Sequence, residues 1–306
     1  MSTRSPRLNI GLAVFDGGEF VGEAIERLLA QTYGDFRLIV SDNASSDSTE
    51  AICRRFAALD SRIDYYRNEQ NRGAAWNINH VFELSTSEYF KWAAHDDVCA
   101  PEFLERCVAK LDHDPSAVLC YTDTVIIDEK GDRVADYVDF SEALSEVAHE
   151  RFQIALEKFG LSNPFYGIVR SSALRGTRMI GAYPGSDQVL IAELALMGRI
   201  VKVHEKLFFR RIHPGKADRV NPTYQSLAEW YAPENKDRIQ LENWRLFSGY
   251  VGAVWRASIS RREKVRIFMH LVRWLHWNRR DILSEIVYLF RRLLSRTARP
   301  PAPSAR

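Results

Sequence analysis

An alternation of apolar strands with amphipathic helices constrains the fold of this chain most strongly. Leu8–Phe15 reads as a buried strand, residues 20–29 carry apolar side chains at helical spacing, and Phe36–Val40 reads as a second strand. A strand–helix–strand unit of about 30 residues joins parallel neighbours in one sheet. Four such strand-then-helix steps over about 110 residues predict an α/β domain with a doubly wound sheet, whose ligands bind at the carboxyl ends of the strands.

Polar side chains follow two of these strands. The run Ser41–Thr49 follows the second strand, and His95-Asp96-Asp97 follows the aromatic strand Tyr89–Ala94. Adjacent carboxylates are hard oxygen ligands that suit Mg²⁺ or Mn²⁺, and such an ion can hold a diphosphate. The alternative interpretation of the two aspartates is a solvated turn, or a cap on the helix that starts near Pro101.

The pattern becomes less regular after residue 115. It predicts short strands at Ala117–Tyr121, Val125–Ile127, Ile200–Val203 and Leu207–Arg211, a helix over residues 139–160, and an apolar helix at Val189–Met197 that Gly198 ends. The four cysteines are widely spaced and form no Cys-x-x-Cys pair, which excludes a zinc site or a disulfide framework and indicates a reducing compartment. No signal peptide or membrane-spanning run of about 20 apolar residues is apparent.

The charge is distributed unevenly between the two parts of the chain. From residue 251 onward there are 13 lysines and arginines against three acidic residues, whereas residues 1–250 have 29 basic and 37 acidic residues. Residues 256–296 mix arginine with tryptophan and aliphatic side chains, which predicts amphipathic helices lying on an anionic membrane surface. The alternative is helices that pack back on the domain with arginine in water. A nucleic-acid partner is not expected, because no nucleic-acid motif accompanies the charge.

Several motifs together resemble family 2 glycosyltransferases, which use nucleotide sugars. They are the run from Gln31 to Thr49, the segment Asn71–Asn77, His95-Asp96-Asp97, Asn163–Gly167 and Arg211-Ile212-His213. The resemblance covers about residues 7–215. It implies a GT-A-type fold, a doubly wound Rossmann-like mixed sheet, with a nucleotide-binding half at about 1–115, an acceptor half at about 116–215, and a basic helical extension at 216–306.

The resemblance also implies roles for residues on the donor side. The Asp42 carboxylate accepts a hydrogen bond from the base of the donor, which favours uracil or thymine; the alternative is an Asx-type turn residue. The other residues expected at the nucleotide sugar are Ala13, Phe15, Asp16, Gly73, Asn77, His95, Asp96 and Arg211. Asp97 and His213 are expected to bind Mg²⁺ or Mn²⁺, although the family's first motif aspartate is replaced by Ala94.

On the acceptor side, the resemblance gives Tyr166 the role of a sugar platform and Asp187 the role of general base. Asp187 opens a helix, so a helix cap is the alternative. The expected activity is an inverting transfer of one sugar to a lipid-linked or polysaccharide acceptor, by a cytoplasmic enzyme at the inner face of the cell membrane. Two other hypotheses remain: a non-catalytic nucleotide-sugar-binding protein with a decayed metal site, and a nucleotidyltransferase.

Overall fold

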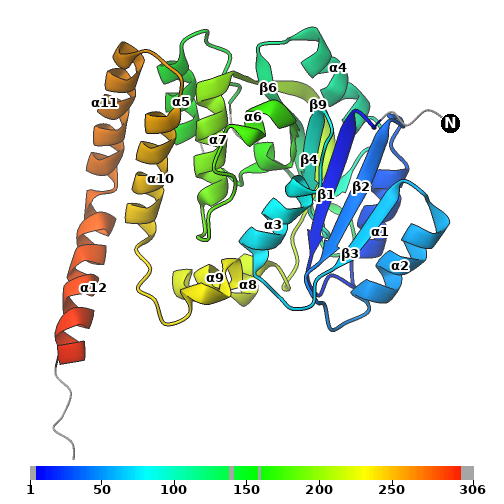
Figure 1. Ribbon diagram of the computed structural model, residues 1–306, viewed down its shortest axis with the longest axis horizontal. Helices are drawn as coiled ribbons and strands as arrows, with labels where there is room; N and C mark the ends of the chain where they lie inside the picture. The colour runs from blue at the N-terminus through cyan, green and yellow to red at the C-terminus, as the bar shows by residue number, and fades with distance from the viewer. Residues whose placement is uncertain (1–4, 138–140, 158–159, 298–306) are drawn as a thin grey trace, which may run out of the picture.

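A mixed nine-stranded sheet runs through the computed structural model, which describes residues 5–137, 141–157 and 160–297 (Figure 1). The order along the sheet is β3-β2-β1-β4-β8-β6-β9-β5, and β7 pairs with β6 outside this path. The strands are β1 Leu8–Val14, β2 Phe36–Asp42, β3 Ile63–Arg67, β4 Tyr89–Ala93, β5 Val98–Cys99, β6 Ala117–Ile127, β7 Arg133–Tyr137, β8 Ile168–Arg170 and β9 Arg199–Arg211.

The N-terminal part of the sheet is parallel, as the sequence predicts. β1 pairs in parallel with β2 and with β4, and β2 pairs in parallel with β3. Helices α1 (Val21–Leu29), α2 (Thr49–Leu59) and α4 (Phe103–His113) share one hydrophobic core with this sheet, and α3 (Ala74–Glu83) belongs to a second core. The carboxyl ends of β1, β2 and β4 therefore meet at one edge between two layers of helices.

Two strands in the second half of the sheet are longer than the sequence predicts. The two predicted pairs of short strands are single strands, β6 and β9, which lie parallel and pair from Ala117 to Ile127 with register shifts on the way. Thr122 and Thr124, in the gap between the first two predicted strands, are buried within β6. The helix predicted over residues 139–160 is shorter: α5 spans Ala148–Glu157, and residues 138–140 and 158–159 lie outside the described part.

The C-terminal helices pack against α5 and α7, in the second half of the domain. The remaining helical elements are η1 Asn163–Tyr166, α6 Ser171–Arg175, α7 Ser186–Met197, α8 Ala217–Val220, α9 Tyr224–Tyr231, η2 Pro233–Asn235, α10 Glu242–Arg256, α11 Arg261–Trp277 and α12 Arg279–Thr297. α10 lies against α7 and α11 lies against α5 (Figure 1). Among the described residues, no helix combines the length and the hydrophobicity needed to cross a membrane.

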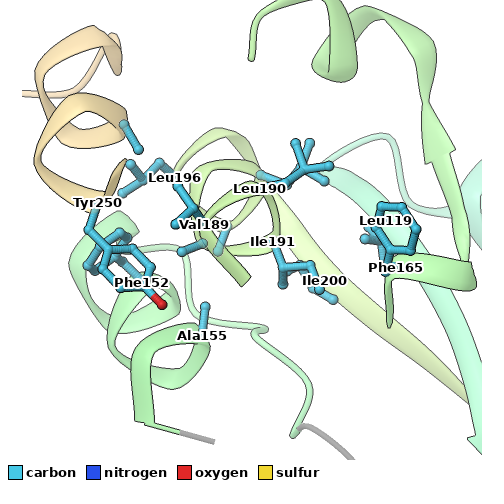
Figure 2. Packing of buried hydrophobic residues seen from close by; sticks show 14 of the residues in the cluster. Leu119, Phe152, Ala155, Phe165, Val189, Leu190, Ile191, Leu196, Ile200 and Tyr250 are labelled. Atoms are coloured by element: carbon cyan, nitrogen blue, oxygen red, sulfur yellow. The ribbon is translucent and has the colours of Figure 1, made fainter. Parts of the chain in front are cut away.

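The helix α7 is buried on nearly all sides, as its apolar sequence predicts. In Figure 2, Ile191 points toward Ile200 of β9, whereas Val189 lies on the side of Phe152 in α5 and Tyr250 in α10. The rings of Phe152 and Tyr250 lie edge to face with their centroids 6.1 Å apart. One hydrophobic core therefore joins the sheet to the C-terminal helices through α7.

Truncating a side chain in this core should destabilise the protein. Leu190→Ala removes a side chain that is 1% exposed, so it should lower the free energy of unfolding by about 3 kcal/mol through lost burial and the cavity left behind. Urea denaturation followed by circular dichroism measures this. The matched control is Leu59→Ala at the end of α2, where the leucine is 78% exposed and the expected change is below about 0.5 kcal/mol. Equal effects of the two variants would contradict the buried position of α7.

Candidate functional site

A cavity of about 710 Å³ opens at the carboxyl ends of β1 and β4. Its floor comes from the turns after these strands and from α3. Its other walls come from η1, the start of α7, the segment after β9, and α9, which lies beside α3 in Figure 1. The volume is that of a typical small-molecule site, and its position is the edge at which open α/β sheets bind ligands.

The turn after β1 lines the cavity through Ala13, Phe15 and Asp16. Asp16 has a positive φ of 49°, and its carboxylate accepts a hydrogen bond from the Ser46 backbone N–H at 2.7 Å. This contact ties the turn after β1 to the turn after β2. Phe15 is 37% exposed, so its ring is available to pack on a flat ligand.

The Asp42 carboxylate does not line the cavity, in contrast to the predicted contact with a base. It is fully buried and accepts hydrogen bonds from the Ser45 backbone N–H at 2.8 Å, the Tyr65 hydroxyl at 2.8 Å and the Arg67 guanidinium at 2.6 Å. The contact with Ser45 is the Asx-type turn of the alternative interpretation. The next residue, Asn43, lines the cavity instead.

Gly73 also has a role other than the predicted approach to the nucleotide. Its φ is +84°, and a Cβ atom there would lie 2.6 Å from the Tyr231 carbonyl oxygen and 2.7 Å from Pro233. Glycine thus allows the α9–η2 segment to close on the start of α3. Asn77 on α3 lines the cavity, but its amide is used by Ser41, to whose carbonyl it donates at 2.8 Å.

Asp96 and Asp97, in the bend between β4 and β5, face two different spaces. Asp96 lines the cavity, with the adjacent His95. Asp97 faces a small internal space of about 10 Å³, and its Oδ1 accepts a hydrogen bond from the Arg211 backbone N–H at 2.9 Å. Burial and the charge of Asp96 raise the pKa of Asp97. Asp96, one of the residues predicted at the nucleotide sugar, is therefore the carboxylate that a ligand can reach, whereas Asp97, the predicted metal ligand, is not.

The charges around Asp96 come from the segment after β9. Its Oδ2 lies 3.0 Å from His213 Nε2 and 2.9 Å from Lys216 Nζ. Burial alone would raise the pKa of Asp96, but the hydrogen bond from His213 and the charge of Lys216 outweigh it, so the pKa lies well below its ordinary value. Asp96 is consequently ionised at neutral pH.

These residues do not fit the predicted Mg²⁺ or Mn²⁺ site. His213 faces Asp96 and not Asp97, and one ammonium group already neutralises the Asp96 carboxylate. Across residues 5–137, 141–157 and 160–297, no group of three or more histidine, cysteine, aspartate or glutamate side chains is placed to hold a metal ion. A hard divalent cation prefers several oxygen ligands, and only one carboxylate lies at this point of the wall.

Arg210 and Arg211 also lie on opposite sides of their strand. Arg210 lines the cavity and donates to Asn163 Oδ1 at 2.8 Å. Arg211, which the sequence places at the nucleotide sugar, is 1% exposed and forms an ion pair with Glu23 at 2.6 Å. Its guanidinium also donates to the Asp96 carbonyl oxygen at 2.9 Å. Arg211 thus supports the site from behind, and Arg210 takes the predicted place on the wall.

The acceptor half of the cavity contains the predicted Asp187 and Tyr166. Asp187 lies in the first turn of α7, after Gly185 with its φ of 83°. Burial raises the pKa of Asp187 more than a hydrogen bond with the Ser162 side chain lowers it. The Tyr166 ring stacks on Phe208 with the centroids 5.6 Å apart, which fixes its orientation.

The wall also contains residues that were not predicted. Among them, Lys216, Trp230 and Tyr231 line the cavity, although they lie beyond the last motif of the sequence. Lys216 follows His213 by three residues, but this spacing does not mark it as part of the site. The two aromatic residues come from α9, whose sequence has no distinguishing pattern.

Known proteins are similar to this chain in sequence and in fold. A family model described as glycosyl transferase family 2 matches residues 10–171. An uncharacterized glycosyltransferase of Rickettsia typhi is 33% identical over 130 residues, which is 42% of this chain and 40% of that protein. The putative glycosyltransferase EpsE of Bacillus subtilis is 30% identical over 131 residues, which is 42% of this chain and 47% of that protein. The matched part is therefore less than half the length of either relative.

Two solved structures share the fold at low sequence identity. The crystal structure of S. aureus TarS 1–349 in complex with UDP has a TM-score of 0.62 at 15% identity, covering 88% of this chain and 72% of that one. The mannosyltransferase PcManGT from Pyrobaculum calidifontis, in complex with GDP-Man and Mn²⁺, has a TM-score of 0.52 at 14% identity, covering 93% and 87%. These similarities confirm the predicted GT-A-type fold. Because the family model matches more than half of its residues, this chain belongs to glycosyl transferase family 2.

Proposed function

We propose that this chain is an inverting glycosyltransferase that moves a sugar from a nucleoside diphosphate sugar to a hydroxyl group of a glycan or lipid-linked acceptor. The observation that carries the proposal is one cavity that holds a carboxylate with a raised pKa, Asp187, together with the cationic side chains of Arg210 and Lys216. A sugar transfer needs both: a group that takes the acceptor proton, and positive charge where the diphosphate leaves.

The donor side of the proposal rests on the turns after β1 and β2. Phe15 offers a ring on which a base can stack, and Asn43 and Asn71 supply polar groups beside it. We favour UDP or dTDP as the carrier on the resemblance alone, since Asp42 is turned away from the cavity. The TarS structure contains UDP and the PcManGT structure contains GDP-Man, which supports a nucleotide at this edge of the fold.

The acceptor side rests on Asp187 and on a set of aromatic rings. Trp92, Phe165, Tyr166, Trp230 and Tyr231 all line the cavity, and apolar ring faces pack well against the C–H face of a sugar. In this mechanism Asp187 takes the proton of the acceptor hydroxyl as its oxygen attacks the anomeric carbon. The attack comes from the side opposite the diphosphate, so the configuration inverts.

The catalytic unit in this proposal extends beyond residue 215. Lys216 and the α9 residues Trp230 and Tyr231 complete the wall, so we place α8 and α9 with the catalytic domain and not with the extension predicted at 216–306. α10 to α12 then form the C-terminal extension. They share the core of α7, so the extension braces the helix that carries Asp187.

Replacing Asp187 should stop turnover and leave the donor bound. Asp187→Asn cannot accept a proton, so release of nucleoside diphosphate from a panel of nucleotide sugars should fall by about 100-fold or more. Binding of UDP, measured by calorimetry, should stay unchanged. Asp136→Asn, a change on the solvent-facing strand β7, is the matched control and should keep full turnover. Full turnover in Asp187→Asn would contradict the role of general base.

The pH profile supplies a second readout for the same residue. A general base acts when deprotonated, so the rate should fall as the pH drops through the pKa of Asp187. Because burial raises that pKa, the acid limb should lie above the ordinary aspartate value of 3.8. A wild-type rate that does not change with pH across this limb would also count against Asp187 as the general base.

We further propose that α11 and α12 attach the protein to the inner, cytoplasmic face of the cell membrane. Val265, Met269 and Val272 follow one another at helical spacing on α11 and are 60–65% exposed. Leu283, Val287 and Phe290 repeat this spacing on α12, which continues α11 almost end to end in Figure 1. We call these six residues the apolar stripe. Exposed arginines flank it, which suits anionic lipid.

The opposite face of α11 packs on the protein through Ile267, Leu271 and Trp274, so the apolar stripe is left for another contact. The four cysteines are free and buried, which supports a reducing compartment. Lipid-linked acceptors lie at a membrane surface, so an enzyme held there meets them at high local concentration.

Polar substitutions in the apolar stripe should release the protein from lipid. The triple variant Val265→Ser, Met269→Ser and Val272→Ser should bind vesicles of phosphatidylglycerol and phosphatidylcholine at least about tenfold more weakly in sedimentation, because three apolar side chains no longer enter the bilayer. Leu59→Ser on α2 is the control and should bind as the wild type does. Equal retention of the triple variant would remove the membrane proposal.

A further inference from the structure

The ammonium group of Lys216 lies on the cavity wall, at the place where a metal-binding carboxylate would face the donor. Lys216 Nζ lies 2.9 Å from Asp96 Oδ2 and 3.5 Å from Asp97 Oδ1. The side chain of Lys216 is only 14% exposed, yet the residue lines the cavity. Lys216 is the N-cap of α8, in extended conformation, which directs its side chain back toward the strand ends.

The chemistry of these contacts differs from that of a metal centre. The Asp96 oxygen that faces the cavity is shared by Lys216 and His213, so a cation and a hydrogen-bond partner already satisfy it. Asp97, the second carboxylate, faces the internal space of about 10 Å³, which is lined in part by Ala24, Leu28 and Phe208. A hydrated divalent ion does not fit a space of that size, which the cationic Lys91 also lines.

We propose that Lys216 takes the place of the divalent cation, and that this chain binds the diphosphate of its donor without a metal. This inference rests on the proposed function. Asp96 holds the Lys216 ammonium at the wall, and Arg210, near the end of β9, adds a second positive charge. A pair of fixed cations can neutralise a diphosphate as a metal ion does, because both supply positive charge where negative charge develops.

The atoms and charges of the proposed transfer step balance without a metal ion. The acceptor oxygen forms a bond to the anomeric carbon, and its proton passes to Asp187. The bond between the anomeric carbon and the diphosphate oxygen breaks, and its electron pair stays on that oxygen. Lys216 and Arg210 stabilise this charge. His213 is a positioning residue here, since it holds Asp96, which in turn holds Lys216.

Calorimetric titration of UDP and GDP into the full chain tests the proposal, once in EDTA and once in Mn²⁺. The wild type should bind one of these nucleotides with the same affinity in both buffers. Lys216→Ala should weaken binding in EDTA by about tenfold or more, the usual size of a lost hydrogen bond between charged groups, and Lys216→Arg should recover part of it. The matched control is Lys206→Ala, which removes the lysine of a surface ion pair with Asp136 and should bind as the wild type does.

Lys216→Ala also leaves Asp96 without its ammonium partner. This variant should therefore bind the nucleotide more tightly in Mn²⁺ than in EDTA. Unchanged circular dichroism of each variant verifies the fold. Binding by the wild type that requires Mn²⁺, or equal binding by Lys216→Ala and the wild type in EDTA, would overturn this inference and leave the proposed function intact. Absence of nucleotide binding in every buffer would overturn the proposed function, and the inference with it.

Discussion

The buried guanidinium of Arg211 is the contact on which the geometry of the cavity depends. It ties the end of β9 to the loop after β4, because Arg211 donates to the Asp96 carbonyl oxygen at 2.9 Å and its backbone N–H donates to Asp97 at 2.9 Å. Its ion pair with Glu23 at 2.6 Å joins α1 to the same point. Three elements far apart in the sequence thus meet at one side chain. With Arg211 fixed, Arg210 must face the cavity, since side chains alternate along a strand.

The long pairing of β6 with β9 carries this arrangement to the acceptor side. β9 brings Arg210 to the cavity and also lies under α7, whose first turn holds Asp187. α7 is packed between the sheet and the helices α5 and α10, so the carboxylate sits on a rigid support. In the proposed mechanism, a fixed proton acceptor and fixed cations need no rearrangement when the charge of the transfer develops, and such preorganisation is a large part of enzymatic rate enhancement.

The comparison between the sequence predictions and the structure follows a consistent pattern. The α/β class, the parallel order of the first strands and the site at their carboxyl ends were all predictable, because strand and helix periods differ clearly. At two positions the residue on the cavity wall is the neighbour of the predicted one: Asn43 for Asp42, and Arg210 for Arg211. Of the two predicted aspartates, Asp96 lines the cavity, whereas Asp97, the predicted metal ligand, does not. A motif locates a site along the chain, but it does not determine which of two neighbouring side chains faces the cavity.

Other parts of the site have no signal in the sequence. Trp230 and Tyr231 reach the cavity because α9 folds back on α3, and this contact depends on the space at Gly73 and not on a local pattern. Lys216 could be recognised only once Asp96 was known to face it. Contacts between distant segments are decided by tertiary packing, which the local periods of a sequence do not record.

The close contact at Gly73 has a consequence for how such a protein can diversify. One boundary of the cavity is a short helical segment, residues 217–235, whose approach to the start of α3 requires a glycine at position 73. Under the proposed function, exchanges within this segment alter the shape offered to the acceptor, and the strand ends where we place the nucleotide stay as they are. Selection can thus retune one substrate while the other is conserved.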